Sequence, residues 1–515
     1  MSEALTVIAA LERTARKFPH KRAVVVNDRT CTYAGLLDRA DRLAAGLRNV
    51  GVRKGSKVAL LMGNRVEFAE TYFGALKTGA TLVVLNARLK GTELTALMRK
   101  SKARWLIFAD TLVGAVDAID LNLRQELTLV TVGESGAPGA LAYESLLSVM
   151  PGQGVRVDVS EADDACILFT SGTTGLPKGA VLAHRNIFFQ AINHIVEWDV
   201  RFDDVEIYPA PLYHGGGLAT LARTVLAGST LVLMESFEAQ DFVTTLERVQ
   251  ATRAVLVPTM CSMILDLPQP LCTSATSLRL IVTGGAIMPV DLKRRHLERL
   301  PGVGLCDSYG QTESTGSVAC LKPADALRKP GSVGRAFFLN DIRLVDDADV
   351  EVAAGEIGEI VVRGPTVMRG YLGEPEATAE TLRAGWLHTG DLARQDEDGF
   401  LYIIGRKKDM IISGGVNIYP LEIEDVLCAH PAVLEAAVIG VPDPVWGESV
   451  KAVVVPKPGI KPSAGELIAF CRKRLAGFKK PRSVEIVDAL PKNSLGKIAK
   501  SELRRQFGSM LVRDA

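Results

Sequence analysis

Short apolar runs rich in β-forming residues alternate with longer amphipathic segments through most of this 515-residue chain. Val58–Met62 and Leu82–Leu85 are typical of buried strands, and Glu67–Leu76 and Thr92–Lys100 have the spacing of helices. Strands separated by helices usually pair in parallel, because the helix carries the chain back to the edge at which each strand starts. The pattern predicts an α/β fold with largely parallel sheets, and the length predicts more than one domain.

The pattern changes twice in the last third of the chain. Val333–Val362 holds short strands separated by turns, which predicts a β-rich subdomain. A charged stretch at Gly405–Asp409 then separates two apolar runs, and the segments beyond it suffice for a compact α+β domain. We therefore predict a large N-terminal domain over residues 1–405 and a small C-terminal domain over residues 409–515.

Charge and cysteine content limit the partners of the chain. Sixty basic and fifty-nine acidic residues leave a net charge of +1 with no dense basic tract, which argues against a nucleic-acid partner. The eight cysteines form no C-x-x-C pair, which favours reduced thiols and a cytoplasmic protein. No apolar run approaches the roughly 20 residues that span a bilayer, so we expect no integral membrane segment. The sequence leaves open whether the chain forms a homodimer.

The sharpest motif runs from Thr170 to Gly179, directly after the predicted strand Ala165–Phe169. Glycine and hydroxyl residues let a loop direct N–H and O–H donors at phosphate oxygens, and Lys178 adds a positive charge. The segment is not a P-loop, because Lys178 follows a proline and Gly179 stands where a serine or threonine should hold Mg²⁺. It predicts a phosphate-binding loop of a different kind.

This segment resembles the signature loop of the adenylate-forming (AMP-binding) superfamily, which includes acyl-CoA synthetases, coumarate–CoA ligases and luciferases. Asp307–Glu313, Trp386–Asp391 and Pro491–Lys497 look like further motifs of the same superfamily. The resemblance implies an acyl-CoA synthetase of the fatty-acid or aryl-acid branch. Such an enzyme uses ATP and Mg²⁺ to adenylate a carboxylic acid, then forms a thioester with coenzyme A and releases AMP and pyrophosphate.

The resemblance also implies the roles of individual residues. The implied catalytic residues are Thr173, Lys178, His214 and Lys497, and the implied Mg²⁺ ligands are Thr173 and Glu313. The implied nucleotide contacts are Thr170, Ser171, Gly172, Thr173, Thr174, Gly175, Lys178, Gly284, Gly285, Ala286, Asp307, Ser308, Tyr309, Gly310, Gln311, Thr312, Asp391, Ile403, Arg406 and Lys497. Residues 406–408 fall where the superfamily keeps its hinge, centred on Lys408, which implies a mobile C-terminal domain.

The acid and coenzyme A sites are implied by shorter segments. Pro211–His214 resembles the superfamily's aromatic–histidine motif, and the implied acyl pocket comprises Tyr213, His214, Gly215, Gly216, Gly217, Met260 and Gly285. Ser413–Pro420 resembles the loop that lines the pantetheine channel. The implied coenzyme A contacts are Gly414, Gly415, Lys479 and Lys480. The pocket is apolar, and both aryl acids and medium or long aliphatic acids fit it.

Three other functions share these motifs. The first is an acyl-AMP ligase that loads a separate carrier protein, the second is a luciferase-like oxygenase, and the third is a non-catalytic regulator that binds nucleotide. A regulator that retained the fold but lost catalysis should also have lost some of its charged site residues. Because Lys178, Glu313, Asp391, Arg406 and Lys497 are all present, the sequence favours the enzyme.

Overall fold

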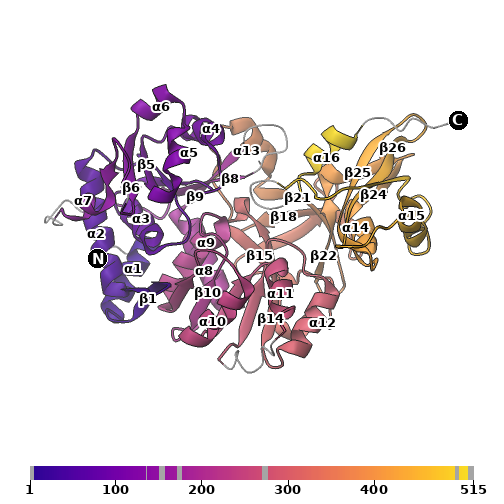
Figure 1. Ribbon diagram of the computed structural model, residues 1–515, viewed down its shortest axis with the longest axis horizontal. Coiled ribbons are helices and arrows are strands. Elements are labelled where there is room, and N and C mark those ends of the chain that lie inside the picture. The colour runs from indigo at the N-terminus through magenta and orange to yellow at the C-terminus, as the bar shows by residue number, and fades with distance from the viewer. Residues whose placement is uncertain are drawn as a thin grey trace. The chain divides into compact units, whose positions relative to one another are not determined.

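The computed structural model describes residues 5–134, 136–149, 157–170, 177–268, 277–492 and 498–508 (Figure 1). The chain divides into two compact units. Unit 1 comprises Met1–Ile342 with Val362–His388, and unit 2 comprises Arg343–Val361 with Thr389–Ala515. The predicted hinge at residues 406–408 lies inside unit 2, and its action as a hinge stays a prediction.

The first sheet of unit 1 has eight strands in the order β19-β9-β8-β4-β3-β5-β6-β7. In that order they span Gly370–Tyr371, Lys178–Ala183, Asp164–Thr170, Thr81–Val84, Lys57–Leu61, Trp105–Ala109, Thr128–Val132 and Leu141–Ala142. From β8 to β7 every neighbouring pair is parallel, whereas β9 is antiparallel to β8 and to β19. The predicted parallel arrangement is confirmed here.

The second sheet of unit 1 has nine strands in the order β16-β15-β14-β13-β12-β10-β11-β1-β2. In that order they span Arg335–Ala336, Gly316–Leu321, Gly304–Gln311, Leu280–Thr283, Arg253–Leu256, Val205–Tyr208, Thr230–Leu233, Arg22–Val26 and Arg29–Thr32. The strands from β14 to β1 are parallel, so the carboxyl ends of β12, β13 and β14 meet at one edge. Loops at such an edge are the usual place for a ligand in an α/β sheet.

Two helices, α8 (His184–Glu197) and α9 (Gly215–Ala227), pack between the two sheets (Figure 1). Helix α9 ends at Gly228, which takes the left-handed conformation that commonly closes a helix. Buried residues of both helices and both sheets form one large apolar core. The other helices of unit 1 are α1 (Val7–Lys17), α2 (Tyr33–Asn49), α3 (Val66–Lys77), α4 (Gly91–Ser101), α5 (Val113–Asp117), α6 (Leu121–Gln125), α7 (Tyr143–Leu147), α10 (Ala239–Val249), α11 (Pro258–Leu265), α12 (Val290–Arg299) and α13 (Pro375–Thr381).

The β-rich region predicted after residue 330 forms a five-stranded sheet. Its strands are β17 (Asp341–Val345), β18 (Ile357–Arg363), β20 (Leu382–Arg383), β21 (Trp386–Gln395) and β22 (Leu401–Arg406). Among the pairs that are described, β20–β21 and β21–β22 are antiparallel. The 3₁₀ helix η4 (Lys407–Asp409) follows β22 directly.

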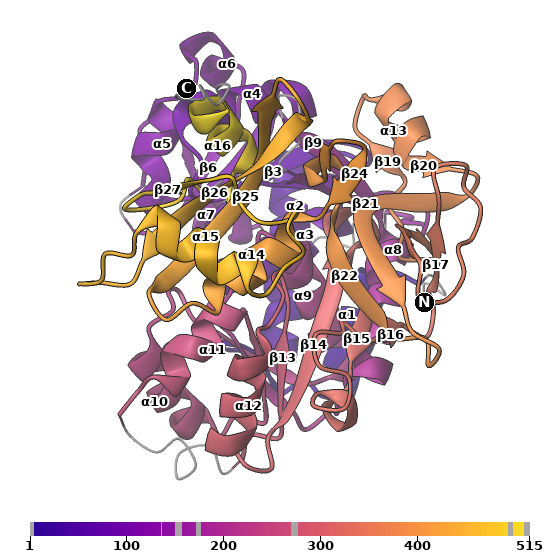
Figure 2. The same ribbon diagram turned by 90° about the vertical axis from the view of Figure 1, so that its right-hand side faces the viewer.

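The last hundred residues of unit 2 form the predicted α+β fold around a second sheet. Its strands are β24 (Val416–Ile418), β23 (Ile411–Ser413), β26 (Gly447–Pro456), β25 (Val433–Asp443) and β27 (Ser483–Ile486). Along β25, Ala436 and Val438 face α14 (Pro420–Cys428) and α15 (Ala464–Arg472), which lie side by side in Figure 2. The alternate residues Ala437 and Ile439 face α16 (Lys500–Phe507). A side-chain period of two thus places helices on both faces of this sheet.

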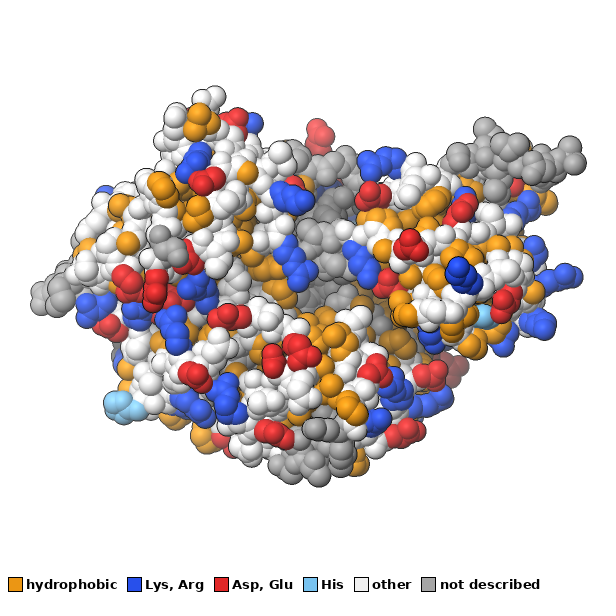
Figure 3. Space-filling model, in the orientation of Figure 1, with side chains coloured by type: hydrophobic (Ala, Val, Ile, Leu, Met, Phe, Trp, Pro, Cys, Tyr) orange, Lys and Arg blue, Asp and Glu red, His pale blue; other side chains and the backbone are white. Residues whose placement is uncertain are grey.

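The surface bears charges of both signs. Acidic and basic side chains are interspersed over the face shown in Figure 3, in keeping with the net charge of +1. None of the helices in the described ranges is long and apolar enough to cross a membrane.

Candidate functional site

The ends of the predicted phosphate loop are held together by backbone pairing. Thr170 is the last residue of β8 and Lys178 the first of β9, and the two residues pair across the antiparallel strands. The Thr170 hydroxyl also donates to the Lys178 carbonyl at 3.4 Å. The predicted contacts Ser171, Gly172, Thr173, Thr174 and Gly175 lie outside the described residues, so their roles stay predictions.

Lys178 and Glu313 come from distant segments and contact the same side chain, Tyr371. The Tyr371 hydroxyl donates to Glu313 Oε1 at 2.9 Å, and Lys178 Nζ lies 4.9 Å from the centre of the Tyr371 ring. Glu313 is buried, with 9% of its surface exposed, and sits in the 3₁₀ helix η2 (Thr312–Ser314). The fold therefore brings the predicted phosphate lysine and the predicted metal carboxylate together.

Glu313 suits a magnesium ion that is shared with a substrate. Proteins commonly hold Mg²⁺ through one or two carboxylates together with substrate phosphates. Within the described ranges no three histidine, cysteine or acidic side chains cluster to form a metal cage. A single carboxylate beside the predicted phosphate lysine fits such a shared ion.

The second nucleotide motif, Asp307–Glu313, comprises the end of β14 and the start of η2. Thr283 is the last residue of β13 and pairs with Asp307, so Gly284–Ala286 leave the sheet beside Ser308–Gln311, which continue β14 and pair with β15. Gly310 is required there, because a β-carbon on it would lie 1.9 Å from the carbonyl oxygen of Gly316. The structure thus brings the predicted contacts Gly284, Gly285, Ala286, Ser308, Tyr309, Gly310, Gln311 and Thr312 to one edge of the sheet.

The Asp307 carboxylate of this motif is bound to other side chains of unit 1. Its Oδ1 accepts a hydrogen bond from the Thr283 hydroxyl at 2.5 Å, and its Oδ2 forms an ion pair with Lys293 of α12. Only 2% of the Lys293 side chain is exposed. The described contacts of Asp307 anchor the motif to α12, and its predicted contact with nucleotide stays a prediction.

The predicted acyl pocket begins where α9 starts. His214 is the residue before the helix, and its ring meets that of Tyr213 edge-on at 4.7 Å. A β-carbon on Gly215 would lie 3.9 Å from the Thr312 backbone, which brings this turn beside the nucleotide motif. A β-carbon on Gly285 would likewise lie close to Val257, the residue before α11. Helix α11 carries Met260.

The three glycines after His214 differ in their surroundings. A β-carbon on Gly217 would lie 2.4 Å from the Leu212 carbonyl oxygen, so this glycine is needed for the close approach of two backbones. A β-carbon on Gly216 would meet only the Tyr208 hydroxyl, at 3.5 Å. Gly216 can therefore take a side chain without displacing the backbone, and its place in the pocket wall stays a prediction.

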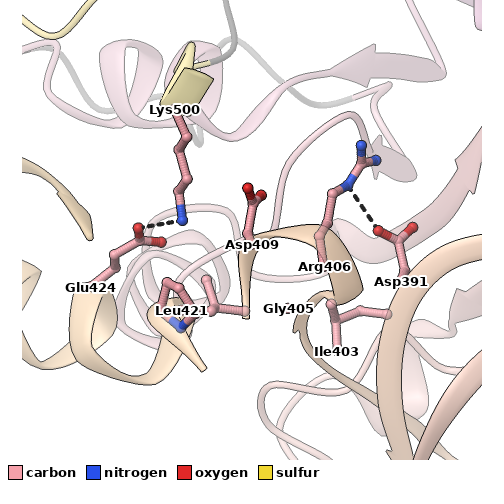
Figure 4. Close-up of a pocket in the computed structure, with 9 residues that line it drawn as sticks. Asp391, Ile403, Gly405, Arg406, Asp409, Leu421, Glu424 and Lys500 are labelled. Atoms are coloured by element: carbon pink, nitrogen blue, oxygen red, sulfur yellow. Dashed lines mark ion pairs between the residues drawn. The ribbon is translucent and has the colours of Figure 1, made fainter. Parts of the chain in front are cut away.

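In unit 2, the two predicted ribose residues pair directly. Asp391 and Arg406 stand opposite each other on β21 and β22, and Arg406 Nε lies 2.9 Å from Asp391 Oδ1. Figure 4 shows this pair at one side of a pocket that Ile403, Asp409, Glu424 and Lys500 also line. Lys500 forms an ion pair with Glu424 at 2.6 Å across the pocket from Asp391.

The predicted hinge residue Lys408 lies in η4, between Arg406 and Asp409. Burial lowers the pKa of Lys408, and the positive charge of Arg406 lowers it further. Asp409, which follows it, is held by Arg504 of α16 at 2.8 Å. An ion pair therefore ties the residue after Lys408 to the last helix of unit 2.

The predicted coenzyme A loop is the turn of the hairpin formed by β23 and β24. Gly414 and Gly415 lie between the paired residues Ser413 and Val416, and both have positive φ, at 59° and 78°. Two consecutive residues with positive φ are typical of tight hairpin turns. A β-carbon on Gly415 would meet no atom within 4 Å, so the space above this turn is open.

Trp446 is a residue beside this turn that the sequence analysis missed. The Gly414 amide donates to the Trp446 carbonyl at 2.8 Å, and a β-carbon on Gly414 would lie 2.6 Å from the indole ring. Trp446 is 44% exposed. Of the two predicted lysines, Lys479 forms an ion pair with Glu422 at 2.7 Å and Lys480 is half-buried.

Lys497, the predicted catalytic lysine, lies outside the described residues. The chain on either side of it is fixed: Lys492 pairs with Ile498, and the Ala499 amide donates to the Pro491 carbonyl at 2.8 Å. Lys492 also forms an ion pair with Glu435 at 2.7 Å. The role of Lys497 stays a prediction.

Comparison with known families covers both units. Residues 11–372 match the AMP-binding enzyme family, and residues 422–497 match the AMP-binding enzyme C-terminal domain. The first match includes Lys178, Glu313 and Tyr371, and the second ends at Lys497.

Similar proteins extend along almost the whole chain. A feruloyl-CoA synthase of Amycolatopsis is 43% identical over 504 residues, which covers 96% of this chain and 98% of the relative. An indoleacetate–CoA ligase of Aromatoleum aromaticum is 39% identical over 500 residues, covering 96% and 97%. A solved structure of o-succinylbenzoate coenzyme A synthetase from Bacillus subtilis, in complex with ATP and a magnesium ion, superposes with a TM-score of 0.86. That structure is 31% identical and covers 96% of this chain and 99% of its own.

Proposed function

The chain belongs to the AMP-binding enzyme family, and we propose which of its residues serve each step of an ATP-dependent acid–CoA ligase reaction. In the first step a carboxylate oxygen attacks the α-phosphorus of ATP, and the bond to pyrophosphate breaks. In the second step the sulfur of coenzyme A attacks the carbonyl carbon, and the bond to AMP breaks. The reaction uses Mg²⁺, which neutralises charge on the phosphates.

The observation that carries this assignment is the joint contact of Lys178 and Glu313 with Tyr371. Adenylation has no covalent enzyme intermediate, so its catalysis depends on positioning and on compensation of phosphate charge. We assign Lys178 to a phosphate oxygen and Glu313 to the Mg²⁺ ion. Lys497 is assigned to the acid carboxylate and the α-phosphate, on the strength of the sequence motif alone.

Asp391 and Arg406 are assigned to the ribose. A carboxylate that accepts two hydroxyl donors makes strong hydrogen bonds, and Asp391 is held in place by Arg406 at 2.9 Å. Gly414 and Gly415 are assigned to the pantetheine arm of coenzyme A, because the open turn leaves room for a slender chain. The exposed ring of Trp446 beside this turn offers an apolar surface to the same arm.

We propose an aryl acid as the substrate. The paired rings of Tyr213 and His214 at the start of α9 suit the face or edge of an aromatic ring. The names of the two relatives, feruloyl-CoA synthase and indoleacetate–CoA ligase, refer to aryl acids, which supports the same class. Medium or long aliphatic acids are the alternative.

A panel of acids tests this function. The purified chain is incubated with Mg²⁺, ATP, coenzyme A and each acid, and the products are identified by mass. We expect AMP, pyrophosphate and the thioester, with aryl acids turned over faster than aliphatic acids of similar size. ADP and orthophosphate as primary products would refute the ligase mechanism, and a preference for aliphatic chains would refute the substrate class.

Two variants of the assay address the rival functions. Pyrophosphate release without a thioester would favour an acyl-AMP ligase that loads a separate carrier protein. Nucleotide binding without turnover of any acid would favour a regulator.

We also propose that the enzyme works in the cytoplasm, because every cysteine that the structure describes is a free thiol. Formation of a homodimer stays a prediction, which light scattering of the purified chain would test.

A further inference from the structure

Residues 366–372 form a strap between β9, which starts at Lys178, and the segment that carries Glu313. On one side, the Arg369 and Leu372 amides donate to the carbonyls of Val181 and Gly179 on β9, at 2.9 and 2.8 Å. On the other side, the Met368 amide donates to the Glu313 carbonyl at 2.8 Å. The strap therefore fixes the backbone of β9, which starts at Lys178, relative to the backbone of Glu313.

The strap is held in one conformation by its own sequence. Gly370 has a φ of 148°, and a β-carbon on it would lie 2.6 Å from Thr378 Cγ2, so only glycine fits. The Thr378 hydroxyl accepts a hydrogen bond from the Tyr371 amide at 2.9 Å. These contacts set the direction in which the Tyr371 side chain leaves the strap.

Two contacts of the Tyr371 side chain, of different kinds, reach Glu313 and Lys178. Its hydroxyl donates to Glu313 Oε1 at 2.9 Å, while its ring faces Lys178 Nζ at 4.9 Å. A cation over an aromatic face is attracted by the ring, and a carboxylate that accepts a hydrogen bond loses rotational freedom.

We infer that Tyr371 is a positioning residue that orients the Glu313 carboxylate for Mg²⁺ and holds Lys178 beside it for the phosphates. The inference rests on the roles proposed above for Glu313 and Lys178. In this role Tyr371 acts through Glu313 and Lys178. It is the hydrogen-bond partner of the proposed metal ligand Glu313. Loss of such a partner typically weakens metal binding by about 10- to 100-fold.

Two substitutions separate the two contacts. Tyr371→Phe keeps the ring over Lys178 and removes the hydroxyl from Glu313. Tyr371→Leu removes both contacts. Tyr402 of unit 2 provides the matched control, because its hydroxyl donates to Asp396 Oδ2 at 3.2 Å and Arg394 lies 4.3 Å from its ring centre.

The measurement is pyrophosphate release by the full chain with an accepted acid, titrated with Mg²⁺ and separately with ATP. For Tyr371→Phe we expect the half-saturating Mg²⁺ concentration to rise by about tenfold or more, with the wild-type rate restored at saturating Mg²⁺. For Tyr371→Leu we expect the same shift and, in addition, an increase in the KM for ATP of about threefold. Tyr402→Phe and Tyr402→Leu should leave both values unchanged.

The outcomes distinguish this inference from the proposed function. If the wild-type chain adenylates no acid, the proposed function fails. If the wild type is active and Tyr371→Phe shows the Mg²⁺ dependence of the wild type, the inference about Tyr371 is wrong. A loss of rate in Tyr371→Phe that excess Mg²⁺ does not restore would also overturn it, because a residue that serves only the fold gives that result.

Discussion

The phosphate-side residues of unit 1 and the coenzyme A turn of unit 2 differ in how firmly the fold holds them. Asp307 and Glu313 are buried, and each carboxylate has a fixed partner, Lys293 for one and Tyr371 for the other. Gly414 and Gly415 instead lie at an exposed hairpin turn. Stabilising charge on a phosphate requires groups that are already in place, whereas a thiol arm requires access. The comparison suggests that adenylation depends on preorganisation and thioester formation on open space.

The largest expected effect concerns the buried ion pair of unit 1. Lys293→Met leaves the Asp307 carboxylate buried without its charged partner, which typically costs about 3–5 kcal/mol of unfolding free energy. The comparable change in unit 2, Lys479→Met, breaks the solvent-accessible pair with Glu422 and should cost less than about 1 kcal/mol. Urea unfolding of both variants checks this. Equal losses would show that the two units do not differ in the way described.

The second prediction concerns pH. Burial lowers the pKa of His184 in unit 1 from the ordinary 6.5 to about 4, and neither ring nitrogen has a hydrogen-bond partner among the described residues. Between these values the unfolded chain binds a proton that the folded chain does not. The contribution of His184 to the free energy of unfolding is therefore fully present above pH 6.5. It falls as the pH drops towards 4, and about 2 kcal/mol is lost at pH 5.

His184→Leu should remove this part of the pH dependence of stability. His20→Leu, at an exposed position, is the control and should keep it. Unfolding free energies measured at pH 7 and pH 5 give the comparison. An unchanged difference between the two pH values in His184→Leu would contradict the assignment.

The third prediction sharpens the description of the acid pocket. Gly216→Leu should raise the KM for bulky acids by about tenfold, which corresponds to about 1.4 kcal/mol, and leave the KM for ATP unchanged. The control is Gly465→Leu, since Gly465 occupies the same position in the first turn of α15 and is also exposed. An unchanged rank order of acids in Gly216→Leu would show that this turn is not a wall of the pocket.

The smallest effect is expected in unit 2. Here the stability changes with pH in the direction opposite to that predicted for His184. Partial burial, together with the negative charge of Glu424, raises the pKa of Asp425 from 3.8 to about 6. The folded chain then holds a proton that the unfolded chain releases, so stability is lost as the pH rises from 3.8 through 6.

Asp425→Asn should stabilise the chain at pH 7 by less than about 1 kcal/mol, because Asp425 is only partly buried and solvent screens its charge. It should have no effect at pH 4. Asp488→Asn, at an exposed position, serves as the control in the same calorimetric melts. Destabilisation of Asp425→Asn at pH 7 would contradict the raised pKa.

The sequence predicted the layers of the fold but not the contacts within the site. Alternation of strands and helices is a local property, so the parallel pair β3–β4 could be predicted from residue spacing. Tyr371 could not, since it lies in the two-residue strand β19 and its role comes from contacts with distant segments. Trp446 was missed for the same reason, because only the tertiary fold places it on Gly414.

The roles of single residues were harder to predict than the family. The spacing within Asp307–Glu313 gave no sign that Asp307 is paired with Lys293, fourteen positions earlier on another element. Burial and pairing decide which polar residues of a motif support the fold. Both depend on the tertiary structure.

The central claim, that the two steps depend on different parts of the chain, is tested most directly by measuring each step in two variants. Lys497→Ala should slow acyl-adenylate formation by about 10²–10³ and still convert supplied acyl-adenylate and coenzyme A into thioester. Gly415→Leu should form the adenylate and fail to form the thioester. Gly459→Leu, at an exposed glycine with a φ of 79° and similarly open space, should slow neither step. Equal slowing of both steps in both variants, with the fold intact, would contradict the account.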